Sequence, residues 1–313
     1  MALSAATSPA AARLGEFADD IGATDPVTCV GGRTQWGVGG PVDAGAREVR
    51  APSGVVEHVP EEMTVRVLAG TTVEELHARL LESGQRTVLP ERGGATVGGL
   101  LSVGRSDLHR LGRGPLRDVL LQAVYVSAEG RVVTVGGPTV KNVTGFDLCR
   151  LLVGSLGTIG LLGEVILRTR PVPRSSVWLS GEAPVKRLRN ALYRPSALLW
   201  DGTRTWVYLE GHRSDVEDQR RVAAAHGIAE EVEGPPSLPG NRWSVPPGKI
   251  WSLDPAATGP FVAEVGVGVV HASRPQPSRR PDPVIADLHD RLRERFDPQG
   301  RLNPGRDPLG GGA

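Results

Sequence analysis

The sequence predicts an α+β protein, because strands and helices alternate with glycine-rich turns up to Pro173 and a different pattern follows. Beyond Pro173 glycine becomes scarcer, and the expected elements run in the order β-α-β-β-α-β. An amphipathic helix is expected near the end of the chain. The 313 residues suffice for two or three domains of ordinary size. We therefore expect a larger first domain at residues 1–173 and a smaller second domain at residues 174–272. Residues 273–313 are expected to form a linker and a C-terminal helix that packs back on the first domain.

In the first part, one helix is specified by several signals. Thr71 and Glu74 have the spacing of a capping box, and three leucines give an apolar face that Gly84 ends. Residues 10–21 have the apolar spacing of a second amphipathic helix. In the rest of this part we expect strands at residues 27–31, 48–51, 64–69, 118–127, 131–135 and 164–170. The strands at 118–127 and 131–135 are expected to form a hairpin.

The second part has the order of a split βαβ, or ferredoxin-like, domain. Its strands are expected at residues 177–180, 197–200, 205–210 and 229–232, and its helices at 185–193 and 215–226, the second with a capping box at Ser214 and Glu217. A proline-rich connection is then followed by strands at 249–253 and 261–270. Residues 273–283 read as an extended linker, and residues 284–296 as the C-terminal amphipathic helix.

Composition excludes several classes of function. Lysine and arginine number 36 against 35 acidic residues, so there is no overall charge to attract nucleic acid or an anionic membrane. Two cysteines cannot build a disulfide framework, an iron–sulfur cluster or a structural zinc site alone. The N-terminus lacks a basic region followed by an apolar run, and no window approaches 18 apolar residues. We expect a cytoplasmic, soluble protein.

Three glycine-rich motifs are the main indication of function. GGRTQWG, at residues 31–37, follows an expected strand and can present successive N–H groups to a pyrophosphate. In ATVGGLLSVG, at 95–104, a threonine and a glycine pair open a short helix over whose first turn an anion or ring edge could sit. GSLGTIG lies at 154–160. Taken one at a time, the first motif is also consistent with a simple turn, the second with a helix start weakened by glycine, and the third with a helix C-cap. No G-x-G-x-x-G or GxxxxGK[ST] motif occurs, which disfavours a nicotinamide Rossmann domain and a P-loop kinase.

In this order and spacing, the motifs resemble the FAD-binding domain of the vanillyl-alcohol oxidase / p-cresol methylhydroxylase (PCMH) superfamily over about residues 27–173. The chain is most similar to the branch of glycolate oxidase FAD-binding subunits (GlcE-like), and FDPQGRLNPGR at 296–306 is similar to the closing segment of glycolate and lactate dehydrogenases. The resemblance implies a PCMH-type domain of two α+β subdomains, with the ferredoxin-like domain as a cap over the cofactor. It also implies FAD, which we expect to be non-covalent because the first glycine loop has no histidine.

The same resemblance implies which residues hold FAD. The pyrophosphate would contact Gly31, Gly32, Arg33, Thr34 and Gly37. The flavin and ribityl chain would lie along Pro90, Thr96, Val97, Gly98, Gly99 and Ser102. The adenine half or the ring system would approach Gly157, Ile159, Gly160 and Val165, and Asn303 would return near the isoalloxazine.

The implied activity is oxidation of a small hydroxylated substrate, such as the 2-hydroxy acids glycolate or lactate, by hydride transfer to flavin N5. Such chemistry needs a base for the hydroxyl proton, for which His271 is the candidate, and a cation for the carboxylate, for which Arg150 is the candidate. A single histidine at a strand end is more often structural, and Lys141 and Asn142 are further possible contacts. We expect no metal, because His271 has no partner histidine at ligand spacing.

Two alternatives remain open. The chain is also consistent with a non-catalytic FAD-binding or electron-transfer subunit of a hetero-oligomer, with a flavin or iron–sulfur protein as partner. A flavin-dependent sugar or alcohol oxidase is the third hypothesis.

Overall fold

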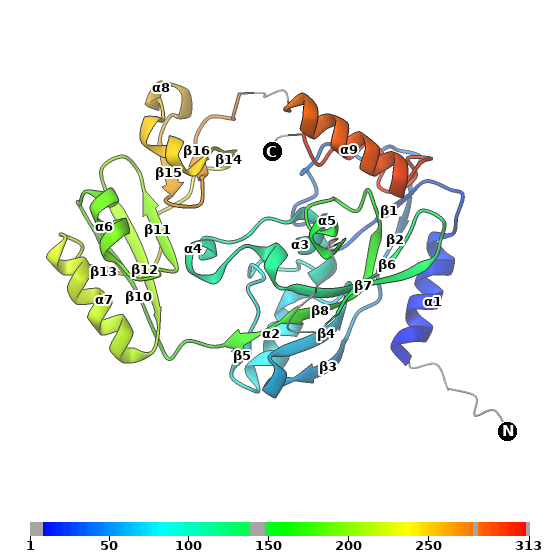
Figure 1. The fold of residues 1–313 in the computed structure, drawn as a ribbon, viewed down its shortest axis with the longest axis horizontal. Coiled ribbons are helices and arrows are strands. Elements are labelled where there is room, and N and C mark those ends of the chain that lie inside the picture. Colours follow the sequence, from blue (N-terminus) through cyan, green and yellow to red (C-terminus); the bar gives the residue numbers. More distant parts are fainter. Residues whose placement is uncertain (1–8, 138–147, 278–280, 311–313) are drawn as a thin grey trace. The chain divides into compact units, whose positions relative to one another are not determined.

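The computed structural model describes residues 9–137, 148–277 and 281–310, and the chain folds as two units (Figure 1). The larger unit comprises the residues up to Arg105, then Leu116–Pro171, and the C-terminal part from Arg280. The smaller unit comprises Ser106–Pro115 and Val172–Arg279. This division differs from the expected boundaries because a short segment at 106–115 leaves the larger unit for the smaller one.

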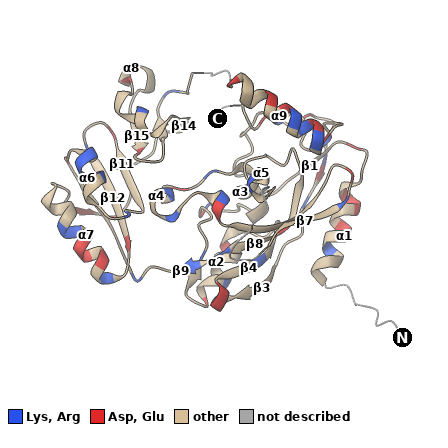
Figure 2. Cartoon of the chain, viewed as in Figure 1, with Lys and Arg blue, Asp and Glu red and all other residues tan. Residues whose placement is uncertain are grey.

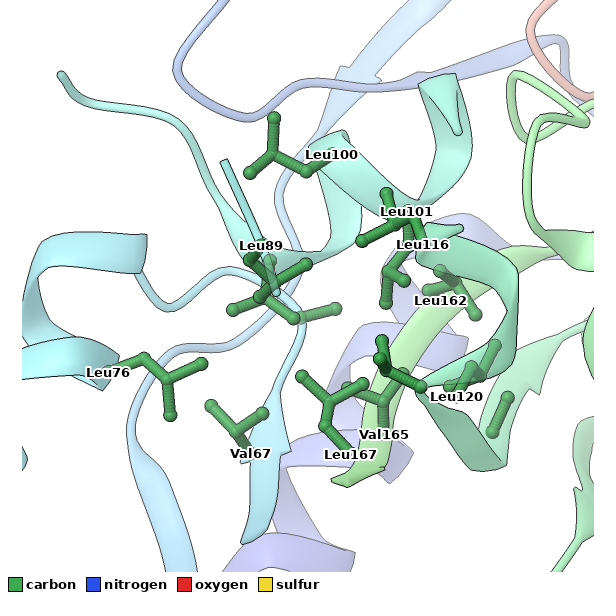
Figure 3. Close-up of a cluster of buried hydrophobic side chains, with 14 of the residues drawn as sticks. Val67, Leu76, Leu89, Leu100, Leu101, Leu116, Leu120, Leu162, Val165 and Leu167 are labelled. Atoms are coloured by element: carbon green, nitrogen blue, oxygen red, sulfur yellow. The ribbon is translucent and has the colours of Figure 1, made fainter. Parts of the chain in front are cut away.

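The larger unit is built on an antiparallel sheet of five strands in the order β3-β4-β8-β6-β7. These strands are β3 (Val55–Val59), β4 (Thr64–Leu68), β6 (Leu120–Val126), β7 (Val132–Gly136) and β8 (Leu161–Arg168). The central strand β8 is buried at every position before its last residue, as its nearly continuous apolar sequence predicts. The core on one face contains side chains of α2 (Val73–Leu81), α3 (Val97–Val103) and α5 (Leu148–Leu152) (Figure 3).

The opposite face of this sheet is covered by α1 (Pro9–Ile21). Leu14 of α1 packs with Leu68 and Val124, and a Cβ on Gly163 of β8 would lie 2.6 Å from the Leu14 side chain. Glycine at 163 therefore lets this helix approach the central strand. The smaller elements of the unit are β1 (Val27–Cys29), β2 (Arg47–Val49), η1 (Pro60–Glu62), β5 (Gln85–Arg86), η2 (Leu116–Asp118), β9 (Arg170–Pro171) and α9 (Pro283–Phe296).

Helix α2 begins one residue later than the expected capping box. Its N-cap is Thr72, whose hydroxyl accepts from the Glu75 N–H at 3.2 Å. Glu74 instead accepts a hydrogen bond from the Gly94 N–H at 2.9 Å. The first turn of α2 therefore fixes the main chain just before α3, where the second glycine motif begins.

The smaller unit has the ferredoxin-like strand order that the sequence predicts. Strands β13-β10-β12-β11 are neighbours in an antiparallel sheet, and β15, β16 and β14 extend it to seven strands. The elements are α4 (Arg110–Arg113), β10 (Ser175–Gly181), α6 (Val185–Ala191), β11 (Ala197–Trp200), β12 (Thr205–Gly211), α7 (Arg213–Ala225), β13 (Glu230–Val232), β14 (Asn241–Ser244), η3 (Pro247–Ser252), α8 (Pro255–Thr258), β15 (Phe261–Glu264) and β16 (Val269–Ala272). Helices α6 and α7 contribute to the core on one face of this sheet.

Three local expectations in the smaller unit are wrong. The strand expected at 249–253 is the 3-10 helix η3, which begins at Pro247. The strand expected at 261–270 is a hairpin, because Gly266 and Gly268 adopt left-handed φ angles of 83° and 84° and turn the chain. The N-cap of α7 is His212, whose ring accepts from the Ser214 N–H, so the predicted capping box does not form.

The helices carry mixed charge on their exposed surfaces. Figure 2 shows acidic and basic residues interspersed along α7 and α9. Within the described ranges, no helix combines the length and apolar character needed to cross a membrane.

Candidate functional site

A cavity of about 440 Å³ lies within the larger unit, a size typical of ligand pockets. Main chain from all three glycine-rich motifs lines it, together with the segment after α9. The structure therefore brings together motifs that lie about 50 residues or more apart in the sequence. Ten of the expected FAD-binding residues line the cavity: Gly31, Gly32, Arg33, Thr34, Thr96, Gly98, Gly99, Ser102, Gly157 and Asn303.

The first glycine loop presents a run of unpaired main-chain donors. The Val30 N–H donates to Val49 and the Trp36 N–H donates to Arg33, but among the described residues nothing accepts from the N–H groups of residues 31–35. Arg33 has a left-handed φ of 55°, and a left-handed residue within a turn directs successive N–H groups to one side. This geometry fits an anionic group such as a pyrophosphate.

Glycine at positions 31 and 32 allows this loop to touch the second motif. A Cβ on Gly31 would overlap the Thr96 hydroxyl, and a Cβ on Gly32 would overlap the Gly94 carbonyl oxygen. The first loop therefore meets the Thr96 side chain at Gly31 and main chain just before the second motif at Gly32. These contacts hold both walls of the cavity at a fixed separation.

Of the two groups that the sequence allowed at the N-terminus of α3, an anion or a ring edge, the main-chain hydrogen bonds disfavour the anion. The N–H groups of Val97 and Gly98 donate to the carbonyls of Thr71 and Ala69 at 2.9 and 2.8 Å. The Gly99 N–H is directed to the hydroxyl of the N-cap, Thr96, at 3.2 Å. With these donors already used, the second motif can offer side chains and main-chain surface to a ring, but no free first-turn N–H group.

Asn303 links strand β1, which lies just before the first motif, to the third motif. Its Oδ1 accepts from the Thr28 hydroxyl at 2.6 Å and from the Cys29 N–H at 3.1 Å. Its Nδ2 donates to the Leu156 carbonyl at 2.7 Å. Gly157 has a left-handed φ of 70°, and a Cβ there would overlap the Asn303 amide. The asparagine and the glycine therefore depend on each other.

Two buried arginines in the segment after α9 hold it against the larger unit. Arg301 donates to the carbonyls of Ile21, Ala128 and Asp25 at 2.7, 2.9 and 3.0 Å. The Arg306 guanidinium donates to the Val38 and Gly40 carbonyls, and it lies 4.6 Å from the centre of the Trp36 ring. Asp297 accepts from the N–H groups of residues 301 and 302. No local pattern marks Asp297, Arg301 or Arg306 as functional residues, although all three lie in the FDPQGRLNPGR motif.

Six expected FAD-binding residues do not line the cavity. Val165 points into the core, where Figure 3 shows it beside Leu167. A Cβ on Gly160 would overlap the Tyr125 ring, so this glycine is required for packing. Gly37 lines a neighbouring hollow in the same unit. The others that lie outside the lining are Pro90, Val97 and Ile159.

The two proposed catalytic residues lie in different units, and neither lines the cavity. Arg150, on α5, is exposed and lies 3.4 Å from an Asp118 oxygen. His271, on β16, has its Nε2 2.9 Å from Glu264 Oε1. Lys141 and Asn142 fall outside the described residues. The described residues contain no group of three histidine, cysteine or acidic side chains that could hold a metal ion.

Cys29 supplies a chemical test of the cavity. Burial raises the pKa of its thiol to about 11, so only about one molecule in a thousand carries the thiolate at pH 8. In the FAD-free protein we expect alkylation of Cys29 by iodoacetamide, followed by peptide mass spectrometry, to be slow at pH 8. The rate should rise about tenfold per pH unit up to pH 10. A rate that levels off near pH 9 would contradict the buried environment.

Comparisons with known proteins relate this chain to FAD-binding proteins. Residues 18–136 match the family model described as FAD binding domain. The chain is 29% identical over 238 residues to glycolate oxidase subunit GlcE of Escherichia coli (strain K12), covering 70% of this chain and 68% of that protein. It is 34% identical over 114 residues to a D-lactate dehydrogenase of Archaeoglobus fulgidus, covering 36% of this chain and 26% of the relative. The aligned part thus spans only about a quarter of that dehydrogenase.

The fold is also similar to solved structures. One of alkyldihydroxyacetonephosphate synthase superposes with a TM-score of 0.67 at 14% identity, covering 93% of this chain and 73% of that one. At this identity the likeness concerns the fold alone. The predicted α+β fold of the PCMH type is confirmed, and FAD is the cofactor that the family match and the flavoprotein relatives support.

Proposed function

We propose that this chain, which belongs with the FAD-linked oxidoreductases that include glycolate oxidase subunits and D-lactate dehydrogenases, oxidises a small 2-hydroxy acid. Bound FAD would supply the two-electron acceptor for the CH–OH group. The observation that carries the proposal is the run of N–H groups at residues 31–35, which have no acceptor among the described residues and belong to residues that line the cavity. This main chain would bind the pyrophosphate, and the ten lining residues predicted from sequence would hold the cofactor.

The substrate class is supported by the relatives. Glycolate and D-lactate appear in the names of the two proteins compared above, and both are 2-hydroxy acids. A carboxylate beside the reacting carbon needs a cation, and the proton of the hydroxyl needs an acceptor. In this chain Arg150 does not line the cavity, so the carboxylate would be bound by other residues.

A second candidate function is favoured by one specific finding. The relative that aligns over 68% of its own length is named as a subunit, so this chain would act as an FAD-binding subunit beside a partner chain. In that arrangement the flavin would relay electrons without oxidising the acid in the isolated chain. The partner and a cytoplasmic location remain predictions of the sequence.

Purified protein distinguishes these functions. We expect a yellow protein with close to one FAD per chain, whose absorbance near 450 nm is bleached anaerobically by glycolate or D-lactate. Bound flavin that neither acid reduces would favour the subunit function over the enzyme. Colourless protein that takes up no added FAD would refute both.

A further inference from the structure

One face of the sheet in the smaller unit carries polar groups that the cavity does not use. Arg242 and Val262 both lie opposite His271 in the ladders of β14, β16 and β15. Residues paired across antiparallel strands share a face, and Glu264, two residues after Val262, lies on the same one. The alternate residues Trp243, Ala263 and Val270 belong to the core on the other face, with side chains of α6 and α7. Arg242, His271 and Glu264 therefore form a cluster on the face away from these helices.

Glu264 orients the His271 ring. The Glu264 side chain is buried, and its Oε1 lies 2.9 Å from His271 Nε2. A carboxylate accepts only, so the ring donates through Nε2, and in the neutral ring Nδ1 is then the acceptor. Among the described residues no group bonds to Nδ1. His271 therefore presents one oriented acceptor.

Arg242 has no anionic partner. Its guanidinium makes no hydrogen bond and no ion pair with any described residue, although the residue is partly buried. Burial lowers the pKa of this guanidinium; the Glu264 charge raises it, and the nearby Arg110 lowers it again. The Arg110 side chain, on α4, is likewise unpaired in the described structure. Two guanidinium groups thus lie close enough to repel each other, with no ion-pair partner.

Two further acids of this unit, Glu210 and Asp107, pair with Arg113 and do not pair with Arg242 or Arg110. Glu210 accepts two hydrogen bonds from Arg113, from Nε and Nη2, both at 2.8 Å. Asp107 lies 3.5 Å from Arg113 Nη1. Burial raises the pKa of Asp107, and Arg113 opposes that rise. The contrast with the well-paired Arg113 indicates that Arg242 and Arg110 are left for a ligand.

We propose that the smaller unit contains a binding site for a small 2-hydroxy carboxylate. Arg242, supported by Arg110, pairs with the carboxylate, and His271 Nδ1 accepts a hydrogen bond from the adjacent hydroxyl. Glu264 is a positioning residue that fixes the ring. This inference rests on the proposed oxidation of a 2-hydroxy acid, and it assigns recognition of that acid to residues of one sheet face.

The test uses a hydroxy acid that the enzyme cannot oxidise and two analogues that each lack one of its polar groups. In 2-hydroxyisobutyrate the carbinol carbon bears no hydrogen, so binding is measured without turnover; isobutyrate lacks the hydroxyl, and 2-methyl-1,2-propanediol lacks the carboxylate. Isothermal titration of the FAD-loaded full chain should show tighter binding of the hydroxy acid than of isobutyrate, and no binding of the diol. Arg242→Gln should weaken both acids by about tenfold or more. His271→Gln should weaken the hydroxy acid alone, to the affinity of isobutyrate.

Stability separates a binding role from a structural one. Replacing Arg242 by glutamine removes a partly buried, unpaired charge, so the variant should melt at the same temperature as the wild type or higher. Arg204→Gln is the matched control in the same unit, because Arg204, just before β12, already pairs with Glu230. The affinity of this variant for both acids should not change. Inorganic phosphate should bind with no dependence on His271.

Three results would overturn the inference: no detectable binding of 2-hydroxyisobutyrate to the wild type, unchanged affinity in Arg242→Gln, or a large drop in its melting temperature. Each is independent of flavin content and flavin reduction, which test the proposed function. If glycolate bleaches the flavin normally but the Arg242 substitution leaves the affinity for 2-hydroxyisobutyrate unchanged, this site alone is refuted.

Discussion

Replacing Gly32 with alanine is expected to reduce the affinity for FAD by about 100-fold, which corresponds to about 2.7 kcal/mol. The backbone at Gly32 is not left-handed, so alanine causes no conformational strain there. The added Cβ would overlap the Gly94 carbonyl oxygen, and main chain cannot move aside as a side-chain tip can. The two loops that enclose the cavity would have to separate. FAD per chain after gel filtration, together with titration calorimetry, measures the effect.

Gly37 provides the matched control in the same loop. A Cβ on Gly37 has no heavy atom within 4 Å, and its backbone is also outside the left-handed region. Gly37→Ala should therefore retain FAD at close to the wild-type ratio, with an unchanged far-ultraviolet circular dichroism spectrum. Equal retention in the two variants would show that contact between the loops does not shape the cofactor site.

The elements that the sequence predicted well are those whose signals are local. The helix after Thr71 is specified by a cap and an apolar face, and the ferredoxin-like order follows from the periodicity of each segment. The glycine loops were recognisable because close approach of main chain requires the residue itself. The turn at 265–268 was not predicted because valines stand on both sides of its two glycines, so the segment has the composition of one continuous strand.

The parts that could not be predicted depend on distant partners. Gly160 resembles a cofactor glycine, but its neighbour is the Tyr125 ring on another strand. Nothing in residues 106–115 indicates that they join the smaller unit; that placement involves the Arg113 pair with Glu210. Arg301 reads as a surface charge, yet its partners are three carbonyls far away in the sequence. Periodicity reports which residues are apolar, and it does not report such pairings.

Replacing Asn303 with aspartate is expected to lower the affinity for FAD by about 100-fold at pH 8. The carboxylate keeps the acceptor for the Thr28 hydroxyl and the Cys29 N–H. It loses the donor to Leu156, and an anionic oxygen would then face that carbonyl oxygen. An unsatisfied or repelled buried group of this kind costs about 1–3 kcal/mol, and the new charge also repels an anionic dinucleotide in the same cavity. Fluorescence titration of the FAD-free protein gives the dissociation constant.

The pH dependence identifies the cause of this loss. A protonated carboxyl has an O–H donor that can reach the Leu156 carbonyl, so lowering the pH to about 5 should restore part of the affinity of Asn303→Asp. The wild type should not show this recovery. Asn190→Asp, at an exposed position of α6 in the smaller unit, adds the same charge away from the cavity and should bind FAD normally. If Asn303→Asp binds FAD as tightly as Asn190→Asp at pH 8, Asn303 does not hold β1 and the third glycine motif in their binding arrangement.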